Sequence, residues 1–576
     1  MLPVFLALAA FWPRDASFLQ VPGKAPARPQ SAAAPPAPAK QATLYRGGKI
    51  ELNDGKGTTA EALLSVDGWV VAVGTLEKLR KLPDARAAVE VDLRSQTAVP
   101  GLQDAHGHVG SYGASLESVD LRDCRSFDEL VSRVAQRASR TKEGEWIVGR
   151  GWDQNLWPDK AFPVHAKLSE ATPKNPVYLV RVDGHAALVN RAAIIKSKLD
   201  QEYRAEPQVR GGRVLLDKDL NPTGVLIDRA MDEIEKLIPK PKPAQIEARI
   251  LAAQEKLLAY GLTCVHDMGI SRRELDVYQK LRASGQLKLR IVAYLAGTEE
   301  LTDAMVEGLP LLPDDRDVLC CPGVKLIADG ALGSRGAALL ADYSDAPGER
   351  GHMILDERAL STRIALCQKH GLQPAVHAIG DLANRTVLNV YQTLLTVYPE
   401  AIELRPRVEH AQVVSLRDWA RFPALGVIPS MQPVHAISDM PWAVDRLGKD
   451  RSRGAYAWRA LAPELGRLAF GSDFPVESPD PRAGLFAARM RSNPGDAPDK
   501  MLPADQSLDG IAALAGFTSG AAYAVHQDER RGRLLPGYAT DMTVMTLDPV
   551  TCPASELLDA KVTMTVINGE VVWRAP

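Results

Sequence analysis

The chain has 576 residues, of which 24% are charged, and a formal net charge of −2 at pH 7. This near-neutral balance argues against a strongly basic nucleic-acid-binding protein and against an acidic, solvating chain. Apolar residues make up 45% of the sequence, which is typical of a globular protein. A (β/α)8 barrel of roughly 250 residues would leave room for further domains. Six cysteines without a CxxC pair exclude a small disulfide-rich scaffold and a thiolate zinc knuckle.

Residues 1–40 are expected to lie outside the folded part of the chain. Residues 1–12 have no polar side chain; this run is shorter than the about 20 residues of a membrane span and matches the hydrophobic region of a signal peptide. Residues 21–40 hold six prolines and seven alanines and predict an extended linker. Together they favour a periplasmic or secreted protein, or a cytoplasmic one if the apolar run is not a working signal. No later segment predicts a membrane span.

Both ends of the remaining chain are rich in β-forming residues. Residues 41–97 alternate short β-rich runs with Gly and Asp turns, and residues 535–576 return to the same pattern. Asn568-Gly569 is a hairpin turn signal. Two such ends around a long middle segment predict one β-sandwich built from both.

Residues 98–534 alternate short apolar runs with amphipathic helices such as 244–260 and 384–398. This pattern predicts βα units around a parallel sheet. About 150 residues separate the first candidate strand from the second, so residues 111–225 are interpreted as an insertion. The fold class is therefore α/β: a (β/α)8 TIM barrel, with the β-sandwich and this insertion. The eight candidate strands are Thr97–Asp104, Leu262–Asp267, Leu287–Leu295, Val324–Ile327, Leu372–His377, Arg405–His410, Val427–Gln432 and Leu468–Asp473.

Histidines and one aspartate end four of these strands. His106 and His108 stand two residues apart, so both side chains point the same way. His377 and His410 end consecutive strands, and Asp473 ends the eighth, which pairs with the first in a closed barrel. The carboxyl ends of the strands form the catalytic face of such a barrel. The pattern therefore predicts a metal site, and imidazole with carboxylate suits Zn, Mn, Fe, Co or Ni.

Lys325 on the fourth strand has two interpretations. Its ammonium could pair with a nearby acid, or its stem could reach to solvent. Alternatively its amine could react with CO2 and form a carbamate anion that bridges two metals. The spacing leaves both open.

As an ordered set, the motifs of residues 42–575 resemble the amidohydrolase superfamily, and within it the family 3 branch of YtcJ-like proteins and N-substituted formamide deformylases. The resemblance implies a (β/α)8 barrel with a β-sandwich from both ends, and a carboxylated Lys325. Gln103 departs from the apolar residue usual at its position. The implied metal ligands are His106, His108, Lys325, His377, His410 and Asp473. The matching stretches are PGLQDAHGH, GWDQNLWP, VDGHAALVN, GLTCVHDMG, KLIADGALGSR, HAIGDLANR, RVEHAQ, MQPVHA, GSDFPVESPDPRAGLFAA and GRLLPGYATDMTV.

The predicted enzyme is a metal-dependent amidohydrolase that cleaves a non-peptide C–N bond of a small molecule. One or two divalent ions, zinc in the first place, would activate a hydroxide, and Asp473 would carry the proton to the leaving nitrogen. Asp104 could serve the structure, or it could orient His106. Strand alternation makes Glu409 a less favoured ligand than His410, and His266 is interpreted as a residue that supports a ligand or packs, and not as a ligand.

Four residues are candidates for substrate contacts. They are His185, Trp152, Arg335 and His435, and the forked donors of Arg335 suit a substrate carboxylate. Each could equally be a packing or turn residue.

Two other functions stay open. A lactonase or phosphotriesterase could use the same metal site, and the chain could be a non-catalytic descendant that kept the barrel. No nucleic-acid partner is expected. The sequence leaves the substrate open, together with whether the protein is a homo-oligomer.

Overall fold

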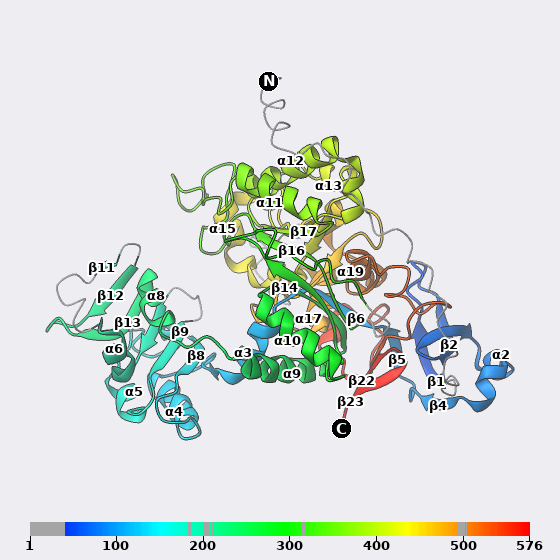
Figure 1. Cartoon of the computed structure of the whole chain (residues 1–576), viewed down its shortest axis with the longest axis horizontal. Helices are drawn as coiled ribbons and strands as arrows, with labels where there is room; N and C mark the ends of the chain where they lie inside the picture. The colour runs from blue at the N-terminus through cyan, green and yellow to red at the C-terminus, as the bar shows by residue number, and fades with distance from the viewer. Residues whose placement is uncertain are drawn as a thin grey trace. The chain divides into compact units, whose positions relative to one another are not determined.

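The computed structural model describes residues 41–181, 186–199, 208–209, 212–313, 318–493, 502 and 504–576. The predicted signal and linker in residues 1–40, and His185, lie outside these described residues. The chain divides into two compact units, one made of Met1–Val109 with Ala253–Pro576 and the other of Gly110–Ala252, and Figure 1 shows their elements.

A parallel barrel of eight strands forms the centre of the first unit (Figure 1). Each of the eight predicted strands is present, so the predicted barrel is confirmed. The neighbouring strands pair in parallel in the order β20-β19-β18-β17-β16-β15-β14-β6. The strands are β6 (Leu102–Gly107), β14 (Leu262–Ile270), β15 (Arg290–Ala296), β16 (Leu319–Ile327), β17 (Gln373–Ala378), β18 (Arg407–His410), β19 (Ile428–Met431) and β20 (Ala469–Phe470).

The helices of the barrel follow its strands. The predicted helices 244–260 and 384–398 correspond to α9 (Pro243–Ala259) and α12 (Asp381–Val397). The other helices of the first unit are α2 (Leu76–Arg80), α10 (Arg272–Ala283), α11 (Glu357–Lys369), α13 (Arg421–Ala424), α14 (Pro433–Ser438), α15 (Met440–Ser452), α16 (Trp458–Leu461), α17 (Pro481–Met490), α18 (Gly510–Gly516) and α19 (Ser519–Tyr523).

The barrel closes between β6 and the segment that follows β20. The backbone N–H of Asp473 donates to the carbonyl of His106 at 2.7 Å, and the N–H of His108 donates to the carbonyl of Phe474 at 2.9 Å. The buried carboxylate of Asp104 accepts the N–H and the hydroxyl of Ser472, the latter at 2.6 Å. We call residues 104–108 together with 471–474 the seam. It places the candidate ligands of the first and last strands side by side.

The predicted first strand, 97–104, is two strands in the structure. β5 (Thr97–Pro100) pairs with β21 (Met542–Met545) in another sheet, and β6 begins at Leu102. The break is at Gly101, whose N–H donates to Asp541 at 2.8 Å. A Cβ at Gly101 would lie 2.4 Å from the Thr263 hydroxyl, so glycine allows the close approach at which the chain changes sheets.

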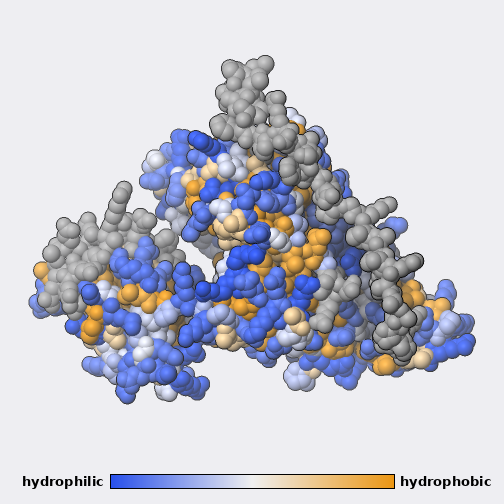
Figure 2. Space-filling view, in the orientation of Figure 1, coloured by the Kyte–Doolittle hydropathy of each residue, from blue (hydrophilic) through white to orange (hydrophobic). Residues whose placement is uncertain are grey.

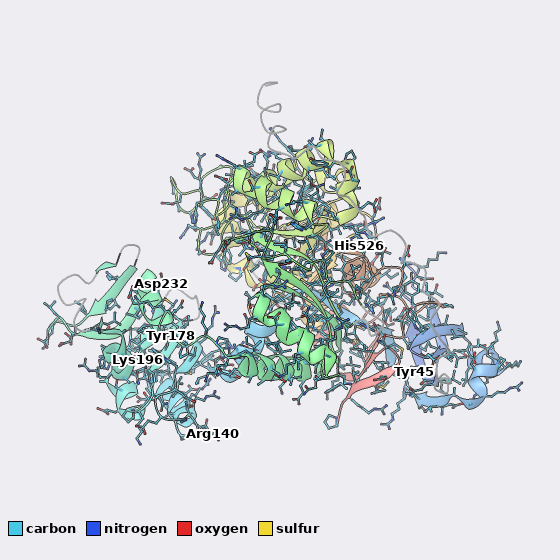
Figure 3. The ribbon with its side chains drawn as sticks, viewed as in Figure 1. Tyr45, Arg140, Tyr178, Lys196, Asp232 and His526 are labelled. Atoms are coloured by element: carbon cyan, nitrogen blue, oxygen red, sulfur yellow. The ribbon has the colours of Figure 1, made fainter. Side chains whose placement is uncertain are left out.

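The strands of both chain ends form one sheet, in the order β23-β22-β21-β5-β1-β2-β3, with β4 beside β1. They share an apolar core that includes Tyr45, Val70 and Met542; Figure 3 labels Tyr45. The Val70 N–H donates to Tyr538, so the sheet curls back on itself. The predicted hairpin at Asn568-Gly569 is present. Its strands are β1 (Ala42–Glu51), β2 (Thr59–Val66), β3 (Trp69–Gly74), β4 (Val89–Asp92), β22 (Val562–Ile567) and β23 (Glu570–Arg574).

The second unit is built on a sheet of seven strands, in the order β11-β12-β13-β10-β9-β8-β7. Residues 111–225, the predicted insertion, lie within it. Trp152 and Leu179 belong to its buried apolar core, and Tyr178, labelled in Figure 3, donates to Glu235 at 2.6 Å. Its elements are α4 (Phe127–Ala138), α5 (Ala166–Ala171), α6 (Arg191–Ser197), α8 (Asp232–Glu235), β7 (Val119–Asp120), β8 (Ile147–Trp152), β9 (Val177–Arg181), β10 (Ala186–Val189), β11 (Gln208–Val209), β12 (Gly212–Leu216) and β13 (Pro222–Asp228), and α3 (Val109–Glu117) joins β6 to it.

The described surface mixes hydrophilic areas with smaller apolar ones on the face that Figure 2 shows. Among the described residues, no helix has the length and apolar character needed to cross a bilayer.

Candidate metal centre

The structure brings the six predicted ligands together at the carboxyl ends of the barrel strands. The ring of His410 lies 4.7 Å from that of His106 and 4.5 Å from that of His377, measured between centroids. His108 Nε2 lies 3.0 Å from Asp473 Oδ1, and Lys325 Nζ lies 3.1 Å from His106 Nε2. Side chains from five strands therefore converge on one small volume.

Hydrogen-bond acceptors at the Nδ1 atoms of three histidines fix the orientation of their rings. His106 Nδ1 lies 2.7 Å from the Glu409 carboxylate, and His108 Nδ1 lies 2.8 Å from the Met268 carbonyl. His410 Nδ1 lies 2.7 Å from the side-chain oxygen of Gln432. Because these oxygens accept hydrogen bonds, each Nδ1 carries the proton. In the neutral rings, Nε2 then carries the lone pair.

These lone pairs have the arrangement that a cation requires. His108 Nε2 faces a carboxylate oxygen of Asp473, so two acceptors stand opposite each other at 3.0 Å unless a proton or a metal lies between them. His377 Nε2 is buried without a hydrogen-bond partner. The donor atoms of His106, His108 and Asp473 lie within 4.8 Å of one another. Imidazole nitrogens and a carboxylate suit zinc and its neighbours, so the residues fit a divalent ion.

Burial sets the charge of these groups. It lowers the pKa of His106 to about 4 and that of His377 to about 3, with the charge of Lys325 adding to the effect. These rings are therefore neutral at pH 7, as metal ligands must be. Burial also lowers the pKa of Lys325 to about 8.

Asp473 remains ionised despite its burial. Burial by itself raises the pKa of this carboxyl, but the hydrogen bond from His108 and the nearby imidazoles lower it well below its usual range. Asp473 is therefore an ionised carboxylate that faces the nitrogen atoms of the centre.

The predicted substrate contacts lie in different places. His435, on α14, has its Nε2 buried without a partner and 3.9 Å from Asp473 Oδ2, and its ring stacks on His410 with centroids 6.2 Å apart. The guanidinium of Arg335 donates two hydrogen bonds to the carboxylate of Asp345, from Nε and from Nη2, and Nη2 lies 3.0 Å from Oδ2. Trp152 is fully buried in the core of the second unit and donates from Nε1 to the Leu179 carbonyl at 2.8 Å.

Of the two roles considered for Asp104, its contacts support the structural one. Asp104 accepts the backbone N–H of His106 and holds the seam, whereas the carboxylate on the ring is that of Glu409. His266 packs in the barrel interior, where its Nδ1 accepts from Arg407 at 3.0 Å.

Sequence reasoning missed Gln432 and Asp329 beside the centre. Gln432 precedes His435 in the MQPVHA motif, but nothing local indicates that its amide supports His410 from another strand. Asp329 lies 3.6 Å from His377 Nε2 and accepts the backbone N–H groups of residues 338, 379 and 380. Burial raises its pKa to about 7.

The comparisons agree with this geometry. Residues 89–573 match the model of the amidohydrolase family. The chain is 30% identical over 540 residues to the putative amidohydrolase YtcJ of Bacillus subtilis, covering 92% of this chain and 99% of that protein. It is 23% identical over 533 residues to the N-substituted formamide deformylase of Arthrobacter pascens, covering 90% and 95%.

A solved structure has the same architecture. An uncharacterized metal-dependent hydrolase of Pyrococcus horikoshii matches with a TM-score of 0.75 and 28% identity, over 89% of this chain and 99% of that one. The chain therefore belongs to the amidohydrolase family and is a metal-dependent hydrolase that acts on carbon–nitrogen bonds.

Proposed function

We propose that this protein hydrolyses a non-peptide amide bond of a small molecule, with Asp473 as the group that moves the proton. The observation that carries the proposal is the position of the Asp473 carboxylate, which faces the Nε2 atoms of His108 at 3.0 Å and His106 at 3.6 Å. A base at this point is in contact with the donors that would hold the ion. The formamide deformylase relative, by its name, acts on a substrate of this class.

His106, His108, His377, His410 and Asp473 would hold one or two divalent ions, with zinc as the proposed metal. A bound divalent ion supplies a water of lowered pKa and polarises the carbonyl of the substrate. The rings of His106 and His377 are ready to bind without first losing a proton, because burial keeps their pKa values low.

Asp473 would act as base and then as acid. Its carboxylate takes a proton from the attacking water and gives it to the leaving nitrogen as the C–N bond breaks. Its lowered pKa keeps it in the accepting form at neutral pH. His435 would hold the substrate, because its unpartnered Nε2 lies beside Asp473.

Lys325 would be carboxylated in the active enzyme. Its amine is buried next to His106 Nε2, and its lowered pKa gives it a larger neutral fraction than an exposed lysine has. A neutral amine reacts with CO2 to give a carbamate and a proton, and the carbamate would add a second anionic ligand beside Asp473 and the imidazoles.

The experiment is a rate panel on the metal-loaded protein. N-formyl and N-acyl amines, lactones and organophosphate triesters are compared, with metal-depleted protein as the control for each substrate. We expect the highest kcat/KM for the amides and its loss on metal depletion. Faster turnover of lactones or triesters, or amide hydrolysis that survives metal depletion, would contradict the proposal.

A further inference from the structure

A buried ion pair lies on β18 directly behind the imidazoles. The side chains of Arg407 and Glu409 have no exposed surface. They stand two residues apart on one strand, so they share a face. Arg407 Nε donates to Glu409 Oε1 at 2.8 Å and Nη2 donates to Oε2 at 3.0 Å. This bidentate pairing fixes Glu409 as a carboxylate with a defined direction.

Four other barrel strands fix the guanidinium in turn. Arg407 Nη2 donates to the Ala105 carbonyl on β6 at 2.8 Å and to the Ser430 hydroxyl on β19 at 2.9 Å. Its Nη1 donates to His266 Nδ1 on β14 at 3.0 Å and to the Tyr294 hydroxyl on β15 at 3.2 Å. With these contacts made, Arg407 cannot turn without breaking bonds to four strands, and Glu409 is held with it.

Among the described residues, one candidate ligand, His106, makes a hydrogen bond to this carboxylate. Glu409 Oε2 accepts the Nδ1 proton of His106 at 2.7 Å. The corresponding acceptors of His108 and His410 are neutral, a backbone carbonyl and an amide oxygen. A hydrogen bond to an ionised acceptor is about twice as strong as one between neutral groups. It also raises the basicity of the opposite ring nitrogen.

We propose that Glu409, held by Arg407, is the positioning residue that strengthens His106 as a nitrogen donor of the candidate metal centre, and that this contact sets the affinity for the divalent ion. The inference rests on the proposed metal-dependent function, but it concerns binding of the ion and not the reaction. Glu409 touches neither the substrate nor the ion in this role.

The test is Co²⁺ binding to the full-length metal-free chain, measured by visible absorption in competition with a chelator. Glu409→Gln keeps an amide oxygen beside His106 but removes the charge. We expect its Kd for Co²⁺ to rise by about 10–100-fold, the range typical for loss of such a supporting group. The Co²⁺ absorption bands are also expected to shift, which a general loss of stability would not cause.

The matched control is Asp541→Asn. Asp541 is another buried carboxylate of the same unit with two bonds from one arginine, Arg290, at the amino-terminal end of β15. The candidate ligands lie at the other end of the strands. Like Glu409→Gln, the control replaces a buried carboxylate by an amide and is expected to lose stability. Its Kd for Co²⁺ is expected to stay within about twofold of the wild type.

A second variant covers the case in which Glu409→Gln does not fold because Arg407 is left unpaired. The double variant Arg407→Met/Glu409→Gln removes both charges, which buried pairs often tolerate, and the same rise in Kd is expected.

Wild-type Co²⁺ affinity in either folded variant, or an equal loss in Asp541→Asn, would overturn the inference. A wild-type protein that binds no Co²⁺ would overturn the proposed function as well. A wild type that binds Co²⁺ but cleaves no amide would overturn only the proposed function.

Discussion

Individual residues at the candidate centre leave the regular geometry of a strand. His410, Ala411 and Asp473 have φ values of 70°, 43° and 61°, in the left-handed region that costs an L-residue about 1–2 kcal/mol. Such conformations gather at functional sites because the surrounding structure holds them there. The turn at His410 also lets its ring and the carboxylate of the preceding Glu409 serve the same cluster, although adjacent strand residues normally point apart.

For a single residue, we predict the effect of Asp473→Asn on kcat and on metal content. An amide of the same shape can still contact His108 but cannot accept a proton, so kcat should fall by about 10²–10⁴-fold, the range for loss of a general base. Much of the metal should remain, because four imidazoles are unchanged. The measurement is kcat on the best amide of the panel, together with metal content by elemental analysis.

The control for this variant is Asp480→Asn. Asp480 follows Asp473 by seven residues and caps α17 through the N–H of Arg482 at 3.0 Å. Its kcat should stay within about twofold of the wild type. Wild-type turnover in Asp473→Asn would refute the proton-transfer role.

Among the elements, β20 and β6 are joined more weakly than the other neighbouring strands. β20 is two residues long, and the seam depends on backbone hydrogen bonds and on Asp104. Gly471 passes so close to β6 that a Cβ there would lie 2.4 Å from the His106 backbone nitrogen and 2.6 Å from Asp104 Oδ1. The position of Asp473 relative to His106 and His108 is therefore set by the absence of a side chain at residue 471.

We predict that Gly471→Ala loses stability and activity together. Overpacking should lower the free energy of unfolding by about 1–3 kcal/mol, and kcat should fall by at least about tenfold because the backbone of one strand must move. Urea unfolding and kcat measure the two effects. Gly285→Ala is the control for kcat, because its Cβ would meet nothing within 4 Å, although its φ of 73° adds a backbone strain that Gly471→Ala does not have. Equal kcat in the two variants would contradict the prediction.

Ion pairs of Asp541 connect the start of β21 to the barrel. Asp541 lies buried between Arg290, whose Nη2 is 3.0 Å away, and Arg531, whose Nε is 3.3 Å away. Burial raises the pKa of this carboxyl, but the two arginines outweigh it and lower the pKa below the ordinary value of 3.8. A carboxyl with a lowered pKa stabilises the folded state above its unfolded pKa, and this contribution is lost as the pH falls through the folded value.

Asp541→Asn should therefore lower the free energy of unfolding by about 3–5 kcal/mol at pH 7, the cost of breaking a buried pair. The difference from the wild type should stay constant down to about pH 4 and shrink only at lower pH, where the wild-type carboxyl takes up a proton. Urea unfolding of both proteins at a series of pH values measures this. A difference that already shrinks between pH 7 and pH 5 would contradict the assignment.

The whole molecule consists of two units, each with its own buried core, and all six candidate ligands lie in the first unit. A ligand that binds only the folded form stabilises what it binds, by about 4 kcal/mol at a free concentration a thousand times its Kd. Removing the metal should therefore lower the unfolding transition of the first unit and leave that of the second unchanged. Differential scanning calorimetry with and without chelator measures both transitions.

Trp152→Ala identifies the second transition. Loss of this fully buried ring should lower the stability of the second unit by about 3–5 kcal/mol and leave the Kd for metal unchanged. A metal-dependent shift of the transition that Trp152→Ala lowers would contradict the assignment of the metal to the first unit alone.

The sequence by itself determined the eight barrel strands, the joining of the two β-rich chain ends and the hairpin at residues 568 and 569. These follow from apolar periodicity and turn chemistry, which act over a few residues. It also supplied His106, His108, His377, His410 and Asp473 as residues at strand ends. The tertiary structure alone decided that Glu409 and Gln432 support His106 and His410, that Asp104 holds the seam and that one predicted strand is two. Those contacts join residues up to several hundred positions apart, and a local pattern carries no information about which distant side chain will fill the space behind a given ring.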